Sequence, residues 1–344
     1  MERSGNSPEK LLVDQVLRRL RHGRVALTFW DGTERYYDHG GPEVEVALTS
    51  AAPIRRVLLN VGLATGEAYM DGTLVIPEDQ LAAWFEIVYR NIPSWRARQP
   101  WRRERNVRRR RPDQIARHYD IGNDYYRLFL GETLLYTCAY FEREDDGLDT
   151  AQRQKVDLVL RKLRLRPGQR LLDIGSGWGY LSVRAAKEHG VRVHGVTLSA
   201  EQLASARALA EREGVADLVT FELTDALDLA GRQRFDRVVA VGVLEHIGRR
   251  NYDRFFRKVR DLLVDDGMAV LHCITSQVDR RPDPWVDKYI FPGGHLPTVP
   301  LVEQQFIDNG LWSIDRENLW HHYARTVALW RDLHRGHRDR IVEM

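Results

Sequence analysis

The sequence has 344 residues, which is long enough for two domains, and its 43% apolar and 29% charged residues are ordinary for a soluble globular protein. Two cysteines, Cys138 and Cys273, offer no disulfide framework, and residues 1–10 lack the apolar core of a signal peptide, so we expect a reducing cytoplasm. No apolar run approaches the roughly 20 residues that span a bilayer, so any membrane role is expected to be peripheral.

The net charge of +3 is distributed unevenly along the chain. Residues 96–111 contain nine arginines and one glutamate, and tryptophan occurs at positions 95 and 101. Such a run is typical of a solvated linker, but it also fits contact with an anionic surface, either phospholipid or nucleic acid. Tryptophan favours the membrane interface, which points to phospholipid.

Residues 1–92 are predicted to form a small α+β domain. An apolar stripe over residues 12–20 predicts a first helix. Residues 24–30 alternate, Asp31-Gly32 signals a turn and residues 35–37 return, so we expect a hairpin. The other predicted elements are a strand at 44–48 and helices at 54–63 and 77–90. The arginine-rich residues 93–111 then form a linker.

Residues 112–344 show a different pattern, in which strands and helices alternate. Apolar stripes predict helices around 156–163 and 255–263. The predicted strands are 171–174, 192–196, 219–223, 237–241 and 268–274. This alternation predicts an α/β fold with a doubly wound, mostly parallel, Rossmann-like sheet. Ligands of such sheets bind beyond the carboxyl ends of the strands. We therefore expect these residues near one edge: Gly175, Thr197, Asp225, Gly242 and Ile274.

A glycine-rich turn follows the first predicted strand of this sheet. Residues 171–179 read LLDIGSGWG, so Asp173 leads into Gly175, Gly177 and Gly179. Glycines at such a turn let the backbone approach a ligand, and the next helix begins with free N–H groups. The spacing is tighter than that of the dinucleotide fingerprint. It resembles the S-adenosylmethionine site of class I methyltransferases.

Several segments together resemble one family, the cyclopropane-fatty-acyl-phospholipid synthases. The resemblance covers roughly residues 112–330, and the N-terminal domain also looks like the sterol-carrier-like lipid-binding module of the family. The motifs that carry it are HYDIGNDY at 118–125, YTCAYF at 136–141, GVTLSAEQ at 195–202, EHIG at 245–248 with Asn251-Tyr252, LHCI at 271–274 and KYIFPGGHLP at 288–297.

The resemblance implies a lipid C-methyltransferase that uses S-adenosylmethionine and bicarbonate and no metal. The methyl group attacks the cis double bond of an unsaturated acyl chain in a phospholipid, a carbocation forms, and loss of a proton closes a cyclopropane ring. An alkene is a poor nucleophile, so the site must be dry, aligned and tolerant of positive charge. The resemblance implies that a bound bicarbonate is the base.

The family's site residues map onto matching positions of this sequence. The residues implied at the bicarbonate site are Cys138, Glu245, His272, Ile274 and Tyr323, with Ile274 acting through its backbone. The residues implied at the cofactor are Tyr136, Thr137, Asp173, Gly175, Gly177, Gly179, Thr197, Gln202 and Asp225. An ordinary buried role remains open for Cys138, His272 and Tyr323, as does a helix-start or turn role for Gln202 and Asp225.

Three departures from the family stand out. Ser176 replaces the usual cysteine, and Ala226-Leu227 replaces an aromatic and arginine pair, which puts adenine stacking there in doubt. The family usually continues for several tens of residues past the position of Met344, so we expect a shortened chain or a more open acyl channel.

Three other functions remain as rivals. One adds a methyl branch to the same alkene, and a second methylates an amine, as some plant enzymes with this catalytic domain do. A third is a nucleic-acid-binding protein that uses the arginine run, which leaves Glu245, His272 and Tyr323 unexplained. We expect an anionic bilayer surface as partner, a homodimer as in many family members, no nucleic acid, and a peripheral position on the inner face of the membrane.

Overall fold

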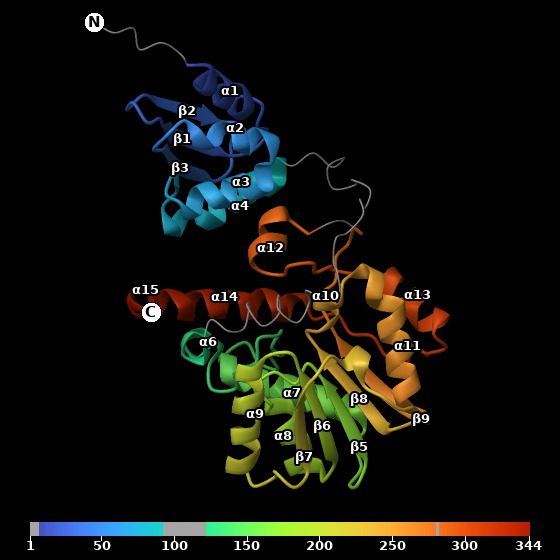
Figure 1. Ribbon diagram of the computed structural model, residues 1–344. Helices are drawn as coiled ribbons and strands as arrows, with labels where there is room; N and C mark the ends of the chain where they lie inside the picture. The colour runs from blue at the N-terminus through green and yellow to red at the C-terminus, as the bar shows by residue number, and fades with distance from the viewer. Residues whose placement is uncertain (1–6, 92–121, 280–281) are drawn as a thin grey trace, which may run out of the picture. The chain divides into compact units, whose positions relative to one another are not determined.

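The computed structural model describes residues 7–91, 122–279 and 282–344 (Figure 1). The chain divides into two compact units. Unit 1 comprises residues 1–102 with 280–290, and unit 2 comprises residues 103–279 with 291–344. The predicted linker at 93–111 lies outside the described residues.

Unit 1 is built on a four-stranded sheet of order β2-β1-β3-β4. The predicted hairpin is confirmed, because β1 and β2 pair antiparallel from Arg24↔Asp38 to Thr28↔Glu34, whereas β3 pairs parallel to β1. Its elements in chain order are α1 (Pro8–Leu17), β1 (Arg24–Thr28), β2 (Glu34–Asp38), β3 (Glu43–Leu48), α2 (Ala52–Leu59), α3 (Val61–Met70), β4 (Leu74–Val75), η1 (Glu78–Gln80) and α4 (Leu81–Asn91).

The helix predicted over residues 54–63 is wrong as a single element. Asn60 lies between α2 and α3 with φ −149°, which no helical residue adopts. Its side chain accepts a hydrogen bond from the N–H of Leu63 and caps α3. The apolar stripe alone did not reveal this break, because asparagine is tolerated in a helix pattern but is favoured as a cap.

The segment 280–290 lies inside the range predicted for the second domain, yet it belongs to unit 1. Its helix α12 (Pro284–Tyr289) packs on α3. A Cβ on Gly66 would clash with the Trp285 ring, so the lack of a side chain there makes room for the indole. Lys288 forms an ion pair with Glu67 of α3, and the Tyr289 hydroxyl donates to the same carboxylate at 3.0 Å.

Unit 2 contains the predicted doubly wound sheet. Its strand order is β7-β6-β5-β8-β9, and all four pairings are parallel. Its elements are α6 (Asn123–Leu130), α7 (Leu148–Leu163), β5 (Arg170–Ile174), α8 (Tyr180–His189), β6 (Arg192–Thr197), α9 (Ala200–Arg212), β7 (Val219–Leu223), η4 (Ala226–Asp228), β8 (Phe235–Val241), α10 (Leu244–Ile247), η5 (Arg249–Asn251), α11 (Tyr252–Leu262), β9 (Leu263–His272), α13 (Val299–Asp308), α14 (Trp320–Gly336) and α15 (Arg338–Glu343).

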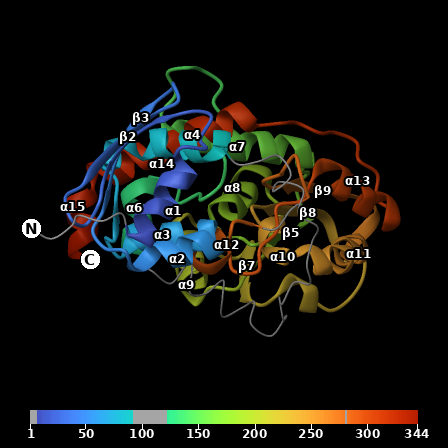
Figure 2. The same ribbon diagram turned by 90° about the horizontal axis from the view of Figure 1, so that it is seen from above.

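Helices cover both faces of this sheet and form a three-layered unit (Figures 1 and 2). One core joins α7, α8 and α9 to side chains such as Leu171 and Val239. The other joins α11 and α13 to the alternate side chains, such as Leu172 and Val238. Successive strand residues point to opposite faces, so continuous apolar runs are needed in strands buried on both sides.

The strand order changes direction between β5 and β8, and this is the point where such sheets bind ligands. The glycine turn follows β5, and Gly242 follows β8 at this point. In the described ranges, no helix has both the length and the apolar character needed to cross a bilayer.

Candidate active site

The glycine turn after β5 adopts a backbone conformation that glycine takes readily. Gly175, Gly177 and Gly179 have φ values of +72°, +55° and +87°. A Cβ on Gly179 would lie 2.8 Å from the Cβ of Ala206 and 2.9 Å from the Phe221 ring, so this glycine allows close packing around α8. A Cβ on Gly177 would meet no heavy atom within 4 Å. Open space therefore lies beside Gly177, where the backbone can approach a ligand.

Two predicted cofactor residues at the end of β6 bond to each other. The Thr197 hydroxyl donates to Oε1 of Gln202 at 2.9 Å, and both side chains are buried. The Ser199 hydroxyl accepts from the N–H of Gln202 and caps α9. The N–H of Gly175 donates to the carbonyl of Val196 at 2.8 Å. The structure thus brings Thr197 and Gln202 beside the glycine turn and fixes their side chains.

The two predicted aspartates each have a partner within the chain. Asp173 is buried in β5 and accepts a hydrogen bond from the Ser182 hydroxyl at 2.6 Å, which ties β5 to α8. Burial raises the pKa of Asp173 to about 6. Asp225 accepts from the N–H of Leu227 at 2.9 Å and caps η4. These contacts are structural, and the cofactor role of both residues stays a prediction.

Tyr136 and Thr137 lie in the irregular segment between α6 and α7. Two side chains of α7 donate hydrogen bonds to this segment. The Lys155 ammonium donates to the Thr137 hydroxyl at 2.7 Å. The Gln152 amide donates to the Thr137 carbonyl at 2.8 Å. The Tyr136 ring packs on Trp330 with centroids 5.2 Å apart, and burial raises the pKa of Tyr136 to about 12. The segment is therefore fixed before any ligand binds.

An aromatic cluster borders the glycine turn. It contains Tyr126, Phe129, Tyr136, Trp178 and Trp330. Trp178 stands between Gly177 and Gly179 in the chain, and its indole N–H donates to Asn123 at 2.6 Å. Aromatic faces attract positive charge, and an apolar wall excludes water. The cluster therefore suits a reaction that passes through a cation.

Glu245 is the most informative side chain of the predicted site. It lies on α10 and is only 3% exposed. One carboxyl oxygen accepts a hydrogen bond from the N–H of Ile274 at 2.6 Å. The other, Oε2, is buried without a hydrogen-bond partner among the described residues. Burial raises the pKa of Glu245 to about 7. A buried acceptor without a partner is costly and is therefore expected to face a ligand.

The backbone N–H of Ile274 donates to Glu245, and a backbone role of Ile274 toward bicarbonate stays a prediction. Ile274 lies two residues beyond the end of β9, 29 residues from Glu245 in the chain. Its role in the structure is to orient that carboxyl group.

Cys138, His272 and Tyr323 surround the same region as neutral groups. Burial lowers the pKa of His272 to about 4 and raises that of Cys138 to about 11, so neutral pH leaves an imidazole and a thiol. Burial also raises the pKa of the Tyr323 phenol, with smaller contributions from Glu245, Tyr136 and Cys138. Neutral phenol and imidazole groups can donate hydrogen bonds to an oxyanion. A thiol of such high pKa is a poor nucleophile.

Sequence reasoning missed Gln152 and Lys155, which are both fully buried on α7. Their spacing in the sequence could have indicated that they are buried. They lie three residues apart and continue the stripe that Val156 and Val159 mark on the buried face of the helix. A lysine on the apolar face of a helix is rarely buried unless it has a partner.

Sequence reasoning also missed a hydrogen-bond network that contacts the backbone of Glu245. The N–H of His295 donates to the Glu245 carbonyl at 2.9 Å. The His295 ring lies 2.9 Å from Asp279 and 2.9 Å from the Tyr252 hydroxyl, and Asp279 pairs with Arg249. This network fixes the backbone of Glu245, and no spacing in the sequence indicated it.

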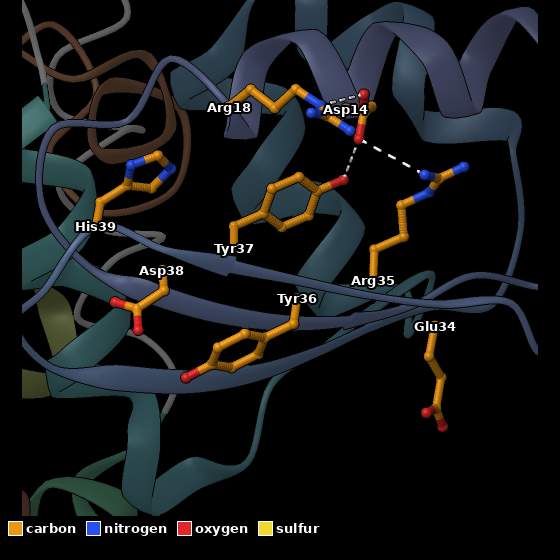
Figure 3. Close-up of a pocket in the computed structure, with 8 residues that line it drawn as sticks. All are labelled: Asp14, Arg18, Glu34, Arg35, Tyr36, Tyr37, Asp38 and His39. Carbon is orange, nitrogen blue, oxygen red and sulfur yellow. Dashed lines mark hydrogen bonds and ion pairs between the residues drawn. The ribbon is translucent and has the colours of Figure 1, made fainter.

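A separate hollow lies in unit 1, and Figure 3 shows its lining. Three of its charged side chains, Asp14, Arg18 and Arg35, are paired with one another. Asp14 accepts from Arg18 at 2.6 Å and from the Tyr37 hydroxyl at 2.8 Å, and Arg35 lies 3.9 Å away. All the predicted site residues lie in unit 2, so this hollow is no part of the candidate active site.

Comparison with protein families identifies both parts of the chain. A family model described as "Mycolic acid cyclopropane synthetase" matches residues 106–344. A second model, described as a domain of unknown function, matches residues 12–99.

Relatives with assigned names support the same family. The chain is 34% identical over 324 residues to the cyclopropane-fatty-acyl-phospholipid synthase of Escherichia coli strain K12, covering 89% of this chain and 82% of that protein. It is 34% identical over 320 residues to a probable fatty acid methyltransferase of Pseudomonas putida, covering 90% and 81%. Cyclopropane mycolic acid synthase 1 of Mycobacterium tuberculosis is 39% identical over 234 residues, 63% of this chain and 79% of that protein.

Solved structures agree with this assignment. The cyclopropane synthase MmaA2 from Mycobacterium tuberculosis and the synthase CmaA1 complexed with SAH and CTAB each give a TM-score of 0.63, at 35% and 34% identity. Each match covers 67% of this chain and 86% of the chain in the solved structure. A coclaurine N-methyltransferase is 22% identical with a TM-score of 0.57, which shows the fold alone. The chain belongs to the mycolic acid cyclopropane synthetase family and is an S-adenosylmethionine-dependent methyltransferase.

Proposed function

We propose that the chain adds the methyl carbon of S-adenosylmethionine to the cis double bond of an unsaturated acyl chain in a phospholipid and closes a cyclopropane ring. The Escherichia coli relative, which matches 89% of the chain, has this substrate class in its name. The single structural observation that supports the chemistry is the buried Oε2 of Glu245, which lies among neutral donors and has no hydrogen-bond partner in the described ranges.

The residues of the chain would hold two ligands at the end of the sheet. When bound, S-adenosylmethionine supplies an electrophilic methyl group and bicarbonate supplies a base for the proton that is lost. The open space beside Gly177 and the pair Thr197–Gln202 suit the cofactor. Tyr136 and Trp178 contribute aromatic rings to the wall that excludes water and tolerates a cation.

The residues present fit a bicarbonate ion. Its hydroxyl needs an acceptor, and Glu245 Oε2 is a buried acceptor without a partner in the described part of the chain. Its other oxygens need donors, and the Tyr323 phenol and the His272 imidazole remain neutral N–H and O–H donors at neutral pH. The N–H of Ile274 bonds to Oε1 of Glu245, which orients the carboxyl group and leaves Oε2 available to accept from bicarbonate.

The decisive experiment is mass spectrometry and proton NMR of unsaturated phospholipid vesicles after incubation with S-adenosylmethionine. We expect a gain of CH2 per acyl chain, loss of the alkene signal and appearance of cyclopropane ring protons. A control with fully saturated phospholipid should show no gain. No mass gain on the unsaturated lipid with an intact, cofactor-binding protein would refute the proposed substrate.

Methyl branching of the same acyl chain is a second candidate, because the Pseudomonas putida relative is named a probable fatty acid methyltransferase. Both reactions begin with methyl transfer to the alkene, and they differ in which proton is lost afterwards. A mass gain without ring protons in the NMR spectrum would support branching.

We further infer that the chain works on the surface of anionic bilayers. The support is the composition of residues 96–111, with nine arginines beside tryptophans. Each basic residue near such a surface contributes about 1 kcal/mol, and salt weakens the attraction. Vesicle co-sedimentation should therefore fall with salt and after replacement of Arg108–Arg111 by serine. Sedimentation that ignores both changes would contradict this inference, and preferential binding of duplex DNA would favour nucleic acid instead.

A further inference from the structure

Two fully buried polar side chains of α7 hold the segment that carries Tyr136, Thr137 and Cys138. Gln152 donates to the carbonyl of Leu135 at 3.1 Å and to that of Thr137 at 2.8 Å. Lys155 donates to the Thr137 hydroxyl at 2.7 Å. Both side chains have an exposed fraction of 0%. They cannot touch a ligand themselves, so they act through the segment above them.

The same segment is held from the other side by α14. The N–H of Ala139 donates to the Thr326 hydroxyl at 3.0 Å, and Thr326 is fully buried. The methyl group of Thr137 faces Gly242, where a Cβ would lie only 2.6 Å from it. The Thr137 side chain is therefore fixed between Gly242 and Lys155, with its hydroxyl directed to the ammonium.

Lys155 lacks the partner that a buried cation normally has. No carboxylate of the described residues lies within ion-pair distance of its Nζ, which donates to the Thr137 hydroxyl instead. The ionisable groups that face it are Cys138 in the loop, Asp173 of β5 and His272 of β9. Burial lowers the pKa of Lys155 to about 7, so at neutral pH the ammonium form is only partly populated and a nearby anion would favour it. An unpaired buried ammonium is costly, and a negative charge close by would offset that cost.

We propose that Lys155 is a positioning residue for the anion of this site: it holds the Thr137 hydroxyl, and its buried charge favours a small anion beside Cys138 and His272. The inference rests on the proposed function, because bicarbonate is the anion which that reaction needs. Neutral donors such as Tyr323 and His272 can orient an anion but supply no net positive charge. Lys155 is the buried cation that the rest of the described site lacks.

The inference predicts a split between the two ligands. S-adenosylmethionine carries a positive sulfonium, so a buried cation does not favour it, whereas bicarbonate is negative. Loss of the Lys155 charge should therefore weaken bicarbonate and spare the cofactor. A purely structural lysine would affect both ligands together with the fold. Methionine resembles lysine in length and volume and is apolar, so Lys155→Met removes the charge with little change in packing.

The test measures binding directly in the full-length protein saturated with S-adenosylhomocysteine. Titration of 13C-bicarbonate followed by NMR gives its Kd for wild type, Lys155→Met and a matched control, Lys187→Met, whose lysine pairs with Glu213 on the surface. We expect Lys155→Met to raise the bicarbonate Kd about 10- to 100-fold, the range that a unit charge roughly 6–12 Å away gives at an effective dielectric constant of about 20. The Kd of S-adenosylhomocysteine by calorimetry and the Tm should stay close to wild type, and Lys187→Met should match wild type throughout.

A second variant keeps the proposal testable if Lys155→Met does not fold. Thr137→Val preserves the side-chain shape but removes the hydroxyl that accepts from Lys155. The buried amine then loses the contact that favours its charged form, so bicarbonate should also bind more weakly. An unchanged bicarbonate Kd in folded Lys155→Met, or in Thr137→Val, overturns the proposal. Wild type that binds no bicarbonate overturns it as well, together with the bicarbonate step of the proposed function. Normal bicarbonate binding by wild type with no effect of either variant overturns the role of Lys155 alone.

Discussion

In the part of the chain that the structure describes, two lysines are almost fully buried, one in each unit, and their surroundings differ. Lys10 of α1 forms an ion pair with Asp31 and donates to the Thr33 hydroxyl at 3.0 Å. Its ammonium also lies 5.3 Å from the Phe29 ring. Lys155 of α7 has the neutral hydroxyl of Thr137 instead.

The difference separates a lysine that stabilises a fold from one that serves a site. The Lys10 ammonium has an ionised partner within the protein. Hydrogen bonding to Lys10 lowers the pKa of Asp31 to about 2, which keeps that carboxylate negative. Lys155 has no carboxylate partner among the described residues, and we expect a bound anion to take that place. The same contrast holds for acids, because Asp31 has a cation and Glu245 has a backbone N–H on one oxygen only.

The largest effect is expected for two residues that we propose to hold the anion, Glu245 and His272. Glu245→Gln and His272→Gln should lower turnover by about 10²–10⁴-fold, the usual contribution of a positioned base, and leave the Kd of S-adenosylhomocysteine near wild type. The reason is that an anion held there acts only after positive charge develops on the substrate. Initial rates against bicarbonate in carbonate-depleted buffer, with calorimetry of the cofactor product, measure both quantities. Near-normal rates in both variants, with wild type indifferent to bicarbonate, would make these residues structural.

Two glycines of one turn should separate ligand binding from stability. Gly177→Ala adds a methyl group in open space, so its main effects are strain at φ +55° and obstruction of the cofactor. We expect at least about a tenfold loss of S-adenosylhomocysteine affinity with a small fall in Tm, since strain of about 1–2 kcal/mol accompanies that φ.

Gly179→Ala should instead destabilise the fold. Its methyl group would lie 2.8 Å from Ala206 and 2.9 Å from Phe221, and overpacking typically costs about 1–3 kcal/mol. Thermal unfolding and calorimetry of both variants provide the comparison. Equal affinity for S-adenosylhomocysteine in wild type and folded Gly177→Ala would mean that the cofactor lies elsewhere.

The sheet and the glycine turn could be predicted because their signals are local. Short apolar runs predicted β5 and β8, and alternating apolar residues predicted β6 and β7. The φ values that favour glycine explain Gly175, Gly177 and Gly179. The start of β9 at Leu263, five residues before its predicted start, was missed because Asp265, Asp266 and Gly267 interrupt its apolar pattern. Solvent-facing polar residues at the strand's start carry no periodic signal.

The parts that escaped prediction depend on contacts between distant residues. The orientation of Glu245 requires Ile274 from another strand end, and the burial of Lys155 requires the packing of α7 against the loop at 135–138. The membership of residues 280–290 in unit 1 depends on Gly66, more than two hundred positions away. The family resemblance pointed to Glu245 and His272 as candidate site residues, but it did not reveal the polar groups around them.

The buried acid should also leave a signature in stability against pH. Glu245 has a pKa of about 7 when folded and an ordinary value near 4.5 when unfolded, so between these values the folded state binds the extra proton. The free energy of unfolding therefore falls as pH rises from about 4.5 to 7 and levels off above. Glu245→Gln removes this fall, so the variant should gain up to about 3 kcal/mol over wild type at pH 8 and nothing at pH 4. Denaturant unfolding at both pH values measures it, and Glu211→Gln on the exposed face of α9 is the control.

The smallest effect tests the comparison between the two lysines directly. Lys10→Met should destabilise the protein, because it leaves Asp31 without its cation and Thr33 without its donor. Breaking a buried pair costs several kcal/mol, but the Asp31 side chain is 40% exposed and regains water, so we expect about 1–2 kcal/mol. Lys155→Met should show no loss of stability, since replacing an unpaired buried cation by an apolar side chain of similar volume is neutral or stabilising. Urea unfolding of both variants at pH 6, where the Lys155 ammonium predominates, decides the matter. If Lys155→Met loses more stability than Lys10→Met, then Lys155 is the structural lysine and the contrast drawn between the two units is wrong.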